Sequence, residues 1–133
     1  GSTLLITMDK TEKEKVTKSK NDPIINMPIV VLVNERSLSD AEVTSNGIKT
    51  LGLATIVGTE TYRWIIFTTG ASMIDGTSLR LPAWGCYSLD GKDLESTGVA
   101  PDIYVKNTFK DRLDDKDPQL ERGVEEILRQ LKK

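Results

Sequence analysis

The stretch Pro28–Glu42, PIVVLVNERSLSDAE, decides the fold that this sequence predicts. It opens on an apolar, largely β-branched run at residues 29–33, which is typical of a strand buried on both faces of a parallel sheet. Residues 34–38 are predicted to form a loop. Ser39 and Glu42 then have the spacing of a capping box, so we expect a helix to begin at Ser39.

The residues after Ser39 predict a helix that leads into a second buried strand. One face of this helix gathers apolar or small residues, namely Ala41, Val43, Gly47, Ile48 and Leu51. Gly52 is expected to end the helix, because glycine readily adopts the positive φ of a C-terminal cap. Residues 54–58, ATIVG, predict the next strand. A strand, a helix and a strand within about 30 residues indicate a βαβ unit with a right-handed crossover.

Outside this unit the sequence predicts short strands and one further helix. Strands are expected at residues 3–8, 64–68, 71–74, 78–81, 84–88 and 103–105, with turns at Gly70, Asp75-Gly76, Pro82 and Asp90-Gly91. The lysine-rich residues 10–20 are expected to be a solvated loop, with a turn at residues 21–23. Asp117 and Pro118 open a final helix, whose apolar stripe is Leu120, Val124, Ile127, Leu128 and Leu131. The predicted class is α/β, with β-hairpins and a closing amphipathic helix.

The composition narrows the classes of function. Its 18 basic and 20 acidic residues give a net charge of −2, which argues against nucleic acid as the main partner. No apolar run approaches the ~20 residues that span a bilayer, and no metal or cofactor motif is apparent. The single cysteine, Cys86, forms no internal disulfide and is expected to be structural. The sequence has no histidine, so a histidine-based triad cannot be completed within this chain.

Ser39 is the first candidate for chemistry. It follows a buried strand and begins a helix, so its hydroxyl is expected beside unpaired backbone N–H groups at the positive end of the helix dipole. Those groups, the Asp40 N–H first among them, would stabilise an oxyanion. The same position also suits a simple N-cap, worth about 1 kcal/mol. The local pattern by itself favours the cap.

Five segments, in order, resemble the tail-specific (C-terminal processing) and tricorn-type serine peptidases. Residues 28–42 resemble the family's nucleophile segment, in which the second serine of a Ser-x-Ser-x-x-Glu run is the nucleophile, here Ser39. The other four are the Gly-x-x-Thr turn at 57–61, the Asp-Gly hairpin at 75–81, the Glu-x-x-Gly-Val-x-Pro-Asp-Ile signature at 95–103 and the closing helix from 117. The resemblance implies endopeptidase chemistry on a crotonase/ClpP-like spiral core. Residues 28–133 would be its C-terminal part and residues 1–27 an incomplete edge.

Differences between this sequence and the family motifs indicate which of the two branches it resembles more. The tail-specific branch uses a lysine in a Thr-x-Gly-Lys-Gly turn, and Trp64 stands in that place here. Arg63 is a poor substitute, because a guanidinium stays protonated. The tricorn branch uses an upstream histidine steered by a glutamate. Glu95 falls at that glutamate's position, although it equally suits an ordinary loop carboxylate. We therefore expect a tricorn-like site whose histidine and second oxyanion glycine lie N-terminal to Gly1.

The resemblance thus implies Ser39 and Glu95 as catalytic residues, with the Asp40 N–H as half of the oxyanion hole. It implies a peptide or protein substrate, no cofactor, and an upstream half of the same core without which the chain is inactive. It also gives the cell envelope a slight preference over the cytoplasm. The alternative is a non-catalytic ligand- or peptide-binding domain on the same fold, as in retinoid-carrying relatives, which the bulky residues 62–64 leave open. Asp102, after Pro101, is expected only to hold a loop.

Overall fold

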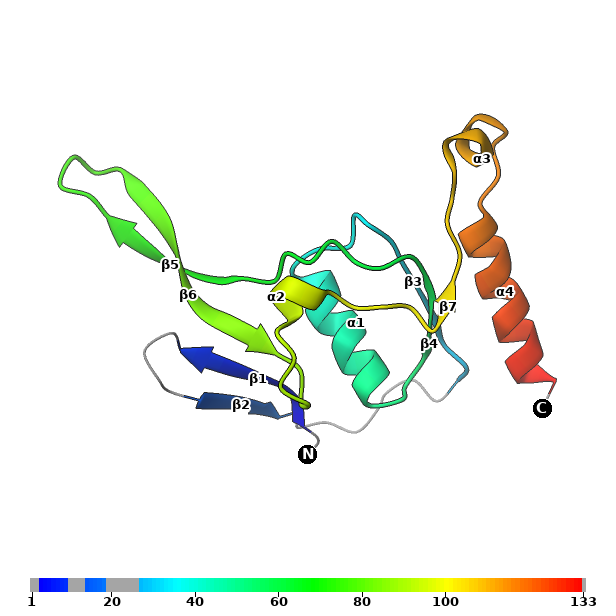
Figure 1. The fold of residues 1–133 in the computed structure, drawn as a ribbon, viewed down its shortest axis with the longest axis horizontal. Coiled ribbons are helices and arrows are strands. Elements are labelled where there is room, and N and C mark those ends of the chain that lie inside the picture. The colour runs from blue at the N-terminus through cyan, green and yellow to red at the C-terminus, as the bar shows by residue number, and fades with distance from the viewer. Residues whose placement is uncertain (1–2, 10–13, 19–26, 133) are drawn as a thin grey trace.

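Two sheets and four helices make up the described part of this chain, residues 3–9, 14–18 and 27–132 of a computed structural model (Figure 1). The antiparallel sheet has the order β2-β1-β6-β5, with β1 Thr3–Asp9, β2 Glu14–Lys18, β5 Phe67–Ser72 and β6 Ser78–Tyr87. The parallel sheet has the order β3-β4-β7, with β3 Val30–Val33, β4 Thr55–Gly58 and β7 Ile103–Tyr104. The helices are α1 Asp40–Thr50, α2 Leu94–Thr97, α3 Phe109–Leu113 and α4 Pro118–Leu131.

The βαβ unit expected from the sequence is confirmed. β3 and β4 are parallel and in register from Val30–Thr55 to Val33–Gly58, and α1 connects them. Gly52 follows α1 with a φ of 63°, as a C-terminal glycine should. Ile56 and Val57 in β4 are fully buried, whereas Leu32 in β3 is 41% exposed. The expectation that the first strand is buried on both faces is therefore wrong, because β3 is an edge strand of this sheet.

The buried face of α1 also differs from the predicted one. The side chains that α1 buries are Glu42, Ser45 and Asn46, whereas Ala41 is exposed. A polar inner face costs free energy unless its groups are hydrogen-bonded. Glu42 and Ser45 meet that condition, the latter through the Ala41 carbonyl oxygen at 2.7 Å. The predicted apolar face is nevertheless partly right, because Gly47 is buried and Val43 packs against the core.

α1 lies on one side of the parallel sheet and α4 on the other (Figure 1). Gly123 faces β3, and a Cβ there would lie 2.9 Å from Leu32 Cδ2, at the end of a side chain that is itself 41% exposed. The expected apolar stripe of α4 is present but largely points away from the sheet: Leu120, Val124, Leu128 and Leu131 are each about half exposed or more. The inner face carries Gln119 and Glu126 instead. This helix therefore presents an apolar surface outward.

The strands of the antiparallel sheet are fewer and longer than predicted. The segments expected at 64–68 and 71–74 correspond to one strand, β5, and those at 78–81 and 84–88 to another, β6. The turns at Asp75-Gly76 and Asp90-Gly91 are confirmed, with positive φ at both glycines. β2 lies within residues expected to form a loop, and the helices α2 and α3 were not predicted. The turn expected at residues 21–23 lies outside the described residues.

Glu126 supplies a pH-dependent contribution to stability. Its buried carboxylate accepts hydrogen bonds from Arg129 and from Gln130, and it also pairs with Arg122. These bonds, that from Arg129 foremost, lower the pKa of Glu126 from 4.5 to about 2. A lowered pKa means that the contribution is complete above the unfolded-state value and is lost as the pH falls toward the folded-state value.

We therefore expect Glu126→Gln to be less stable than the wild type near neutral pH. The gap should close as the pH falls from about 5 to about 2. Urea denaturation of the two proteins across this range measures it. Glu125→Gln, which changes an exposed neighbour, is the control and should show no such closing gap. A difference in unfolding free energy that stays constant with pH would contradict the lowered pKa of Glu126.

Candidate active site

Ser39 is held in a strained backbone conformation where the chain passes from β3 into α1. Its φ of 56° and ψ of −118° are disfavoured for any residue with a side chain. The serine and Glu42 are arranged as a capping box, in which the Ser39 N–H donates to Glu42 Oε2 at 3.0 Å. Capping does not require the strained backbone, because an N-cap residue ordinarily has a β-region conformation. A sharp, strained turn from strand to helix is the way in which α/β-hydrolases present a nucleophilic serine.

The turn at Ser39 is bound to the loop of residues 61–64, which follows β4. The Ser39 N–H donates to the Trp64 carbonyl oxygen at 3.1 Å, and the Tyr62 N–H donates to the Ser37 carbonyl oxygen at 2.9 Å. Between the two segments lies the side chain of Glu42, which has no exposed surface. Its carboxylate accepts hydrogen bonds from both of them. The serine turn and this loop therefore form one hydrogen-bonded unit.

The backbone N–H of Asp40, at the start of α1, has no acceptor among the residues that the structure describes. The next three N–H groups, of residues 41–43, each donate to a carbonyl oxygen of the turn at 2.9 to 3.2 Å. The Asp40 N–H has no such partner among the described residues. A free N–H beside the serine, at the positive end of a helix dipole, is suited to stabilise a negatively charged oxygen. The expected oxyanion donor thus has the right environment.

Glu95 lies in the short helix α2 and not in a loop. The Asp93 side chain caps this helix and accepts the Glu95 N–H at 3.0 Å. The Glu95 side chain is half-buried, and its carboxylate has no hydrogen bond or ion pair with any residue that the structure describes. A half-buried carboxylate without such a partner is free to accept a hydrogen bond from a donor that is not among the described residues.

Thr61 joins the segment after α2 to the serine turn. Its buried hydroxyl donates to Glu42 Oε1 at 2.6 Å and accepts the Val99 N–H at 2.9 Å. The Thr61 N–H returns a hydrogen bond to the Val99 carbonyl oxygen at 3.2 Å. Val99 comes two residues after the end of α2. One threonine therefore connects the segments that carry Ser39 and Glu95.

Arg63 and Trp64 occupy the place where the tail-specific branch has its lysine turn. Arg63 has a φ of 72°, and its guanidinium pairs with Glu60 at 2.5 Å. The Trp64 side chain is 53% exposed and packs against Tyr62, with 5.8 Å between the ring centroids. Neither side chain is a general base at neutral pH. The structure thus agrees with the absence of a serine–lysine pair at this turn.

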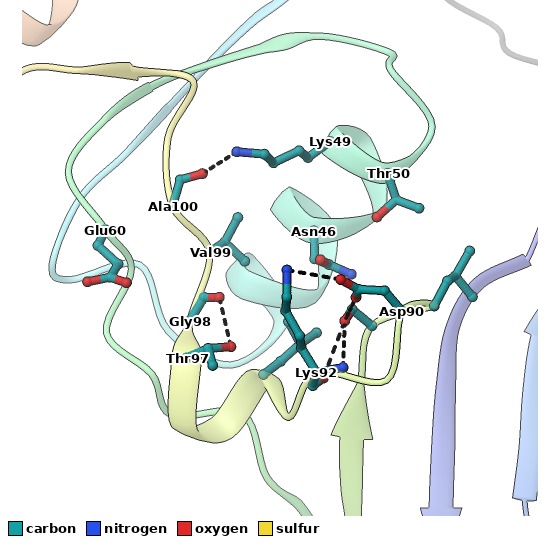
Figure 2. Close-up of a pocket in the computed structure, with 13 residues that line it drawn as sticks. Asn46, Lys49, Thr50, Glu60, Asp90, Lys92, Thr97, Gly98, Val99 and Ala100 are labelled. Atoms are coloured by element: carbon teal, nitrogen blue, oxygen red, sulfur yellow. Dashed lines mark hydrogen bonds and ion pairs between the residues drawn. The ribbon is translucent and has the colours of Figure 1, made fainter.

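The larger of two pockets lies beside the C-terminal half of α1 and has a volume of about 560 Å³ (Figure 2). It is lined by α1 residues, by the turn at residues 88–92 and by residues 97–100. Lys49 spans one side, donating to the Ala100 carbonyl oxygen at 2.6 Å, and Lys92 pairs with Asp90. Neither Ser39 nor Glu95 lines this pocket. Its size therefore does not make it the candidate active site.

A smaller hollow of about 310 Å³ adjoins the serine turn. Its apolar wall is β3, residues 31–33, and its other wall is formed by Ser37 and by the first residues of α1, including Asp40 and Thr44. Ser37 and Asp40, which stand on either side of Ser39 in the sequence, are both part of its lining.

Two further sequence-based expectations are confirmed. Asp102 holds a loop: it accepts the Ile56 N–H at 2.9 Å and pairs with Lys49 at 3.0 Å. Cys86 is fully buried, and burial raises the pKa of its thiol to about 11. A buried thiol that stays protonated at neutral pH is unreactive, which agrees with a structural role.

Two other observations concern the described residues alone. They contain no group of three or more histidine, cysteine, aspartate or glutamate side chains arranged to hold a metal ion. None of their helices is long and apolar enough to cross a membrane.

The sequence profile of Peptidase family S41 matches residues 1–105. The chain belongs to this family. It is 32% identical over 106 residues to the tricorn protease of Thermoplasma acidophilum, an alignment that covers 78% of this chain and 10% of that protein. It is 25% identical over 104 residues to the chloroplastic carboxyl-terminal-processing peptidase 1 of Arabidopsis thaliana, covering 77% and 21% of the two chains. The resemblance inferred from the sequence is confirmed.

Solved structures support the same conclusion. The crystal structure of the tricorn protease superposes with a TM-score of 0.74 and 31% identity, over 80% of this chain and 11% of that one. The photosystem II D1 C-terminal processing protease superposes with a TM-score of 0.71 over 78% and 27% of the chains, and at 24% identity it supports the fold alone. The S41 chain described here therefore spans about a tenth to a quarter of the length of these two relatives.

Sequence reasoning missed the parts that Glu42 and Thr61 play in this S41 site. The Ser-x-x-Glu spacing was the available signal for Glu42, and it suggested only a helix cap. In the structure, Thr61 and the N–H groups of Arg63 and Trp64 bind Glu42 from 19 to 22 residues further along the chain. No local pattern indicates a contact of that range.

Proposed function

We propose that this chain is the nucleophile-bearing, C-terminal half of a serine endopeptidase core with a crotonase/ClpP-like spiral fold. The observation that carries the proposal is the strained Ser39 at the start of α1, with the unpaired Asp40 N–H next to it. Membership of Peptidase family S41 supports peptide-bond hydrolysis as the reaction. The tricorn relatives at 32% identity and the tryptophan at residue 64 favour the branch that uses histidine over the one that uses lysine.

In the proposed reaction, Ser39 Oγ attacks the carbonyl carbon of the scissile bond while an upstream histidine takes its proton. The resulting oxyanion is stabilised by the Asp40 N–H and by a second donor from the upstream half. The histidine returns the proton to the leaving amine, which departs and leaves an acyl group on Ser39. Water then hydrolyses this ester. Glu95 orients the histidine and stabilises its protonated form.

Completion by an upstream half is supported by surfaces that a finished core would cover. β3 is an open edge of the parallel sheet, and the apolar stripe of α4 points outward. The carboxylate of Glu95 has no partner among the described residues. With no histidine in its sequence, the chain by itself is proposed to be inactive.

The substrate of the completed enzyme would be a peptide or protein. Its bacterial relatives leave the slight preference for the cell envelope as an expectation.

The second candidate is a non-catalytic peptide- or ligand-binding domain on the same fold. The observation that favours it is the exposed pair of aromatic rings, Tyr62 and Trp64, on the loop bonded to the serine turn. Exposed aromatic side chains are typical of binding surfaces. In this case the strained serine would have no reactive role.

A fluorophosphonate probe, which reacts with activated serines, separates the two candidates. We expect a protein that carries this chain together with its upstream half to be labelled, and Ser39→Ala to abolish the labelling. Ser37→Ala is the matched control, since it removes the other serine of the turn. The chain alone should stay unlabelled. Labelling that persists in Ser39→Ala would exclude Ser39 as the nucleophile, and an unlabelled wild type would favour the binding domain.

A further inference from the structure

We infer that Glu42 is a positioning residue, whose buried carboxylate fixes the strained turn of Ser39 in the conformation that the reaction needs. The inference rests on the proposed function, because it concerns the reactivity of Ser39. Its geometric basis is independent of that function. Glu42 acts through Ser39 and is not proposed to touch the substrate.

Four donors converge on the Glu42 carboxylate, two on each oxygen. Oε2 accepts the backbone N–H groups of Ser39 and Trp64 at 3.0 and 2.9 Å. Oε1 accepts the Thr61 hydroxyl and the Arg63 N–H at 2.6 and 2.7 Å. The side chain has no exposed surface, and it has no ion pair with any described residue. A buried carboxylate is costly, so it persists here because these bonds satisfy it.

The carboxylate lies where the backbone strain of the site lies. Among the described non-glycine residues, positive φ occurs at Ser39, at Arg63 and, far along the chain, at Asp115. Both of the first two donate their N–H to Glu42. Backbone strain persists only where the surroundings over-determine it, and charge-assisted hydrogen bonds are stronger than neutral ones. Glu42 is therefore the group that holds both strained residues in place.

Loss of the carboxylate would act on chemistry more than on binding. If Ser39 relaxed to an ordinary φ, its hydroxyl and the adjacent Asp40 N–H would turn relative to each other. The nucleophile and the oxyanion donor would then no longer be correctly placed relative to each other. The apolar wall of the hollow, residues 31–33 of β3, would stay unchanged. The expected effect therefore falls on kcat and on the acylation rate, and much less on KM.

Glutamine is a severe change at residue 42, in spite of its similar shape. Its NH₂ group would replace one acceptor oxygen and would face two donors, whichever way the amide is turned. Glu126→Gln is the matched control, because Glu126 is also a buried helical carboxylate with several donors, and it lies on α4 away from Ser39. Both variants should lose stability, but Glu42→Gln alone should lose reactivity.

The test uses a protein that carries this chain together with its upstream half, at a temperature where both variants are folded. We expect Glu42→Gln to lower the fluorophosphonate labelling rate and kcat by about 10²-fold, the size typical of a misplacement of about 1 Å. Its KM should change little, and Glu126→Gln should label as the wild type does. Labelling of Glu42→Gln at the wild-type rate, or an equal loss in both variants, would overturn the inference.

Two further measurements test the role of Glu42 even if Glu42→Gln gives no active enzyme. Thr61→Val removes one of the four donors to Glu42 and also the acceptor of the Val99 N–H, but it leaves the other three bonds to the carboxylate, so it should lower the labelling rate to a lesser extent than Glu42→Gln. Amide hydrogen exchange on the chain itself should show that Arg63 and Trp64, whose N–H groups donate to Glu42, lose protection in Glu42→Gln and keep it in Glu126→Gln. If Ser39 proves unreactive, the proposed function fails while this exchange result still stands. Unchanged protection would instead refute the role of Glu42.

Discussion

Gly58→Ala is expected to lower the free energy of unfolding by about 3–5 kcal/mol, the sum of backbone strain and overpacking. Gly58 ends β4 with a φ of 140°, and a Cβ built there would lie 1.7 Å from the Val33 carbonyl oxygen. The two strands that meet at this point are paired in parallel, so neither backbone can retreat without breaking their register. Domains are typically stable by about 5–15 kcal/mol, so this change would remove a large part of the total.

Urea denaturation followed by tryptophan fluorescence measures this effect, and Gly52→Ala is its matched control. Gly52 also has positive φ, at 63°, but a Cβ there would meet no atom within 4 Å. The control should therefore cost only the strain of a left-handed residue, about 1–2 kcal/mol. If the two variants were equally stable, the close approach of β4 to Val33 would not be a feature of the protein in solution.

The unit of β3, α1 and β4 could be predicted from the sequence because its signals are local. A β-branched run, a capping spacing and a terminal glycine each act within one element. The strand breaks expected at Gly70 and Pro82 were wrong for a reason that only the sheet reveals. Pro82 pairs with Thr68 of β5, whereas the described residues of β1 pair with residues 84–87 of β6. Among the described residues Pro82 thus has one neighbouring strand, and a missing N–H is tolerated on the side without a partner.

Only some of the residues of the candidate site could be assigned a role from the sequence. Ser39 and Glu95 followed from a family resemblance, since their positions within ordered motifs identify them. Glu42 and Thr61 are also fixed positions of the quoted motifs, but the resemblance assigned them no role. Their importance comes from the loop at residues 61–64, which folds back on the serine turn and provides the donors. Likewise the direction of the α4 stripe could not be read from its periodicity, because the side of the helix that is buried carries Gln119, Gly123 and Glu126.

Glu95→Gln is expected to lower kcat by about 10³–10⁴-fold in a protein that carries both halves of the site, the loss typical when the carboxylate of a serine–histidine–carboxylate triad becomes an amide. The amide keeps the shape of the side chain but no longer stabilises the protonated histidine. It also permits the wrong tautomer of the ring. The carboxylate of the half-buried Glu95 has no hydrogen bond or ion pair with a described residue, so its replacement breaks no such bond within the described part of the chain. KM and the unfolding midpoint should therefore change little.

Peptide hydrolysis measured across pH, together with the rate of fluorophosphonate labelling, distinguishes this role from that of an ordinary surface carboxylate. The pH at which activity rises should shift downward in Glu95→Gln, because the histidine loses the charge that favours its protonated form. Glu60→Gln changes an exposed carboxylate that pairs with Arg63, and it should alter kcat by no more than about twofold. A Glu95→Gln variant with the same kcat and pH profile as Glu60→Gln would leave Glu95 outside the catalytic set. The family resemblance alone would then have misassigned it.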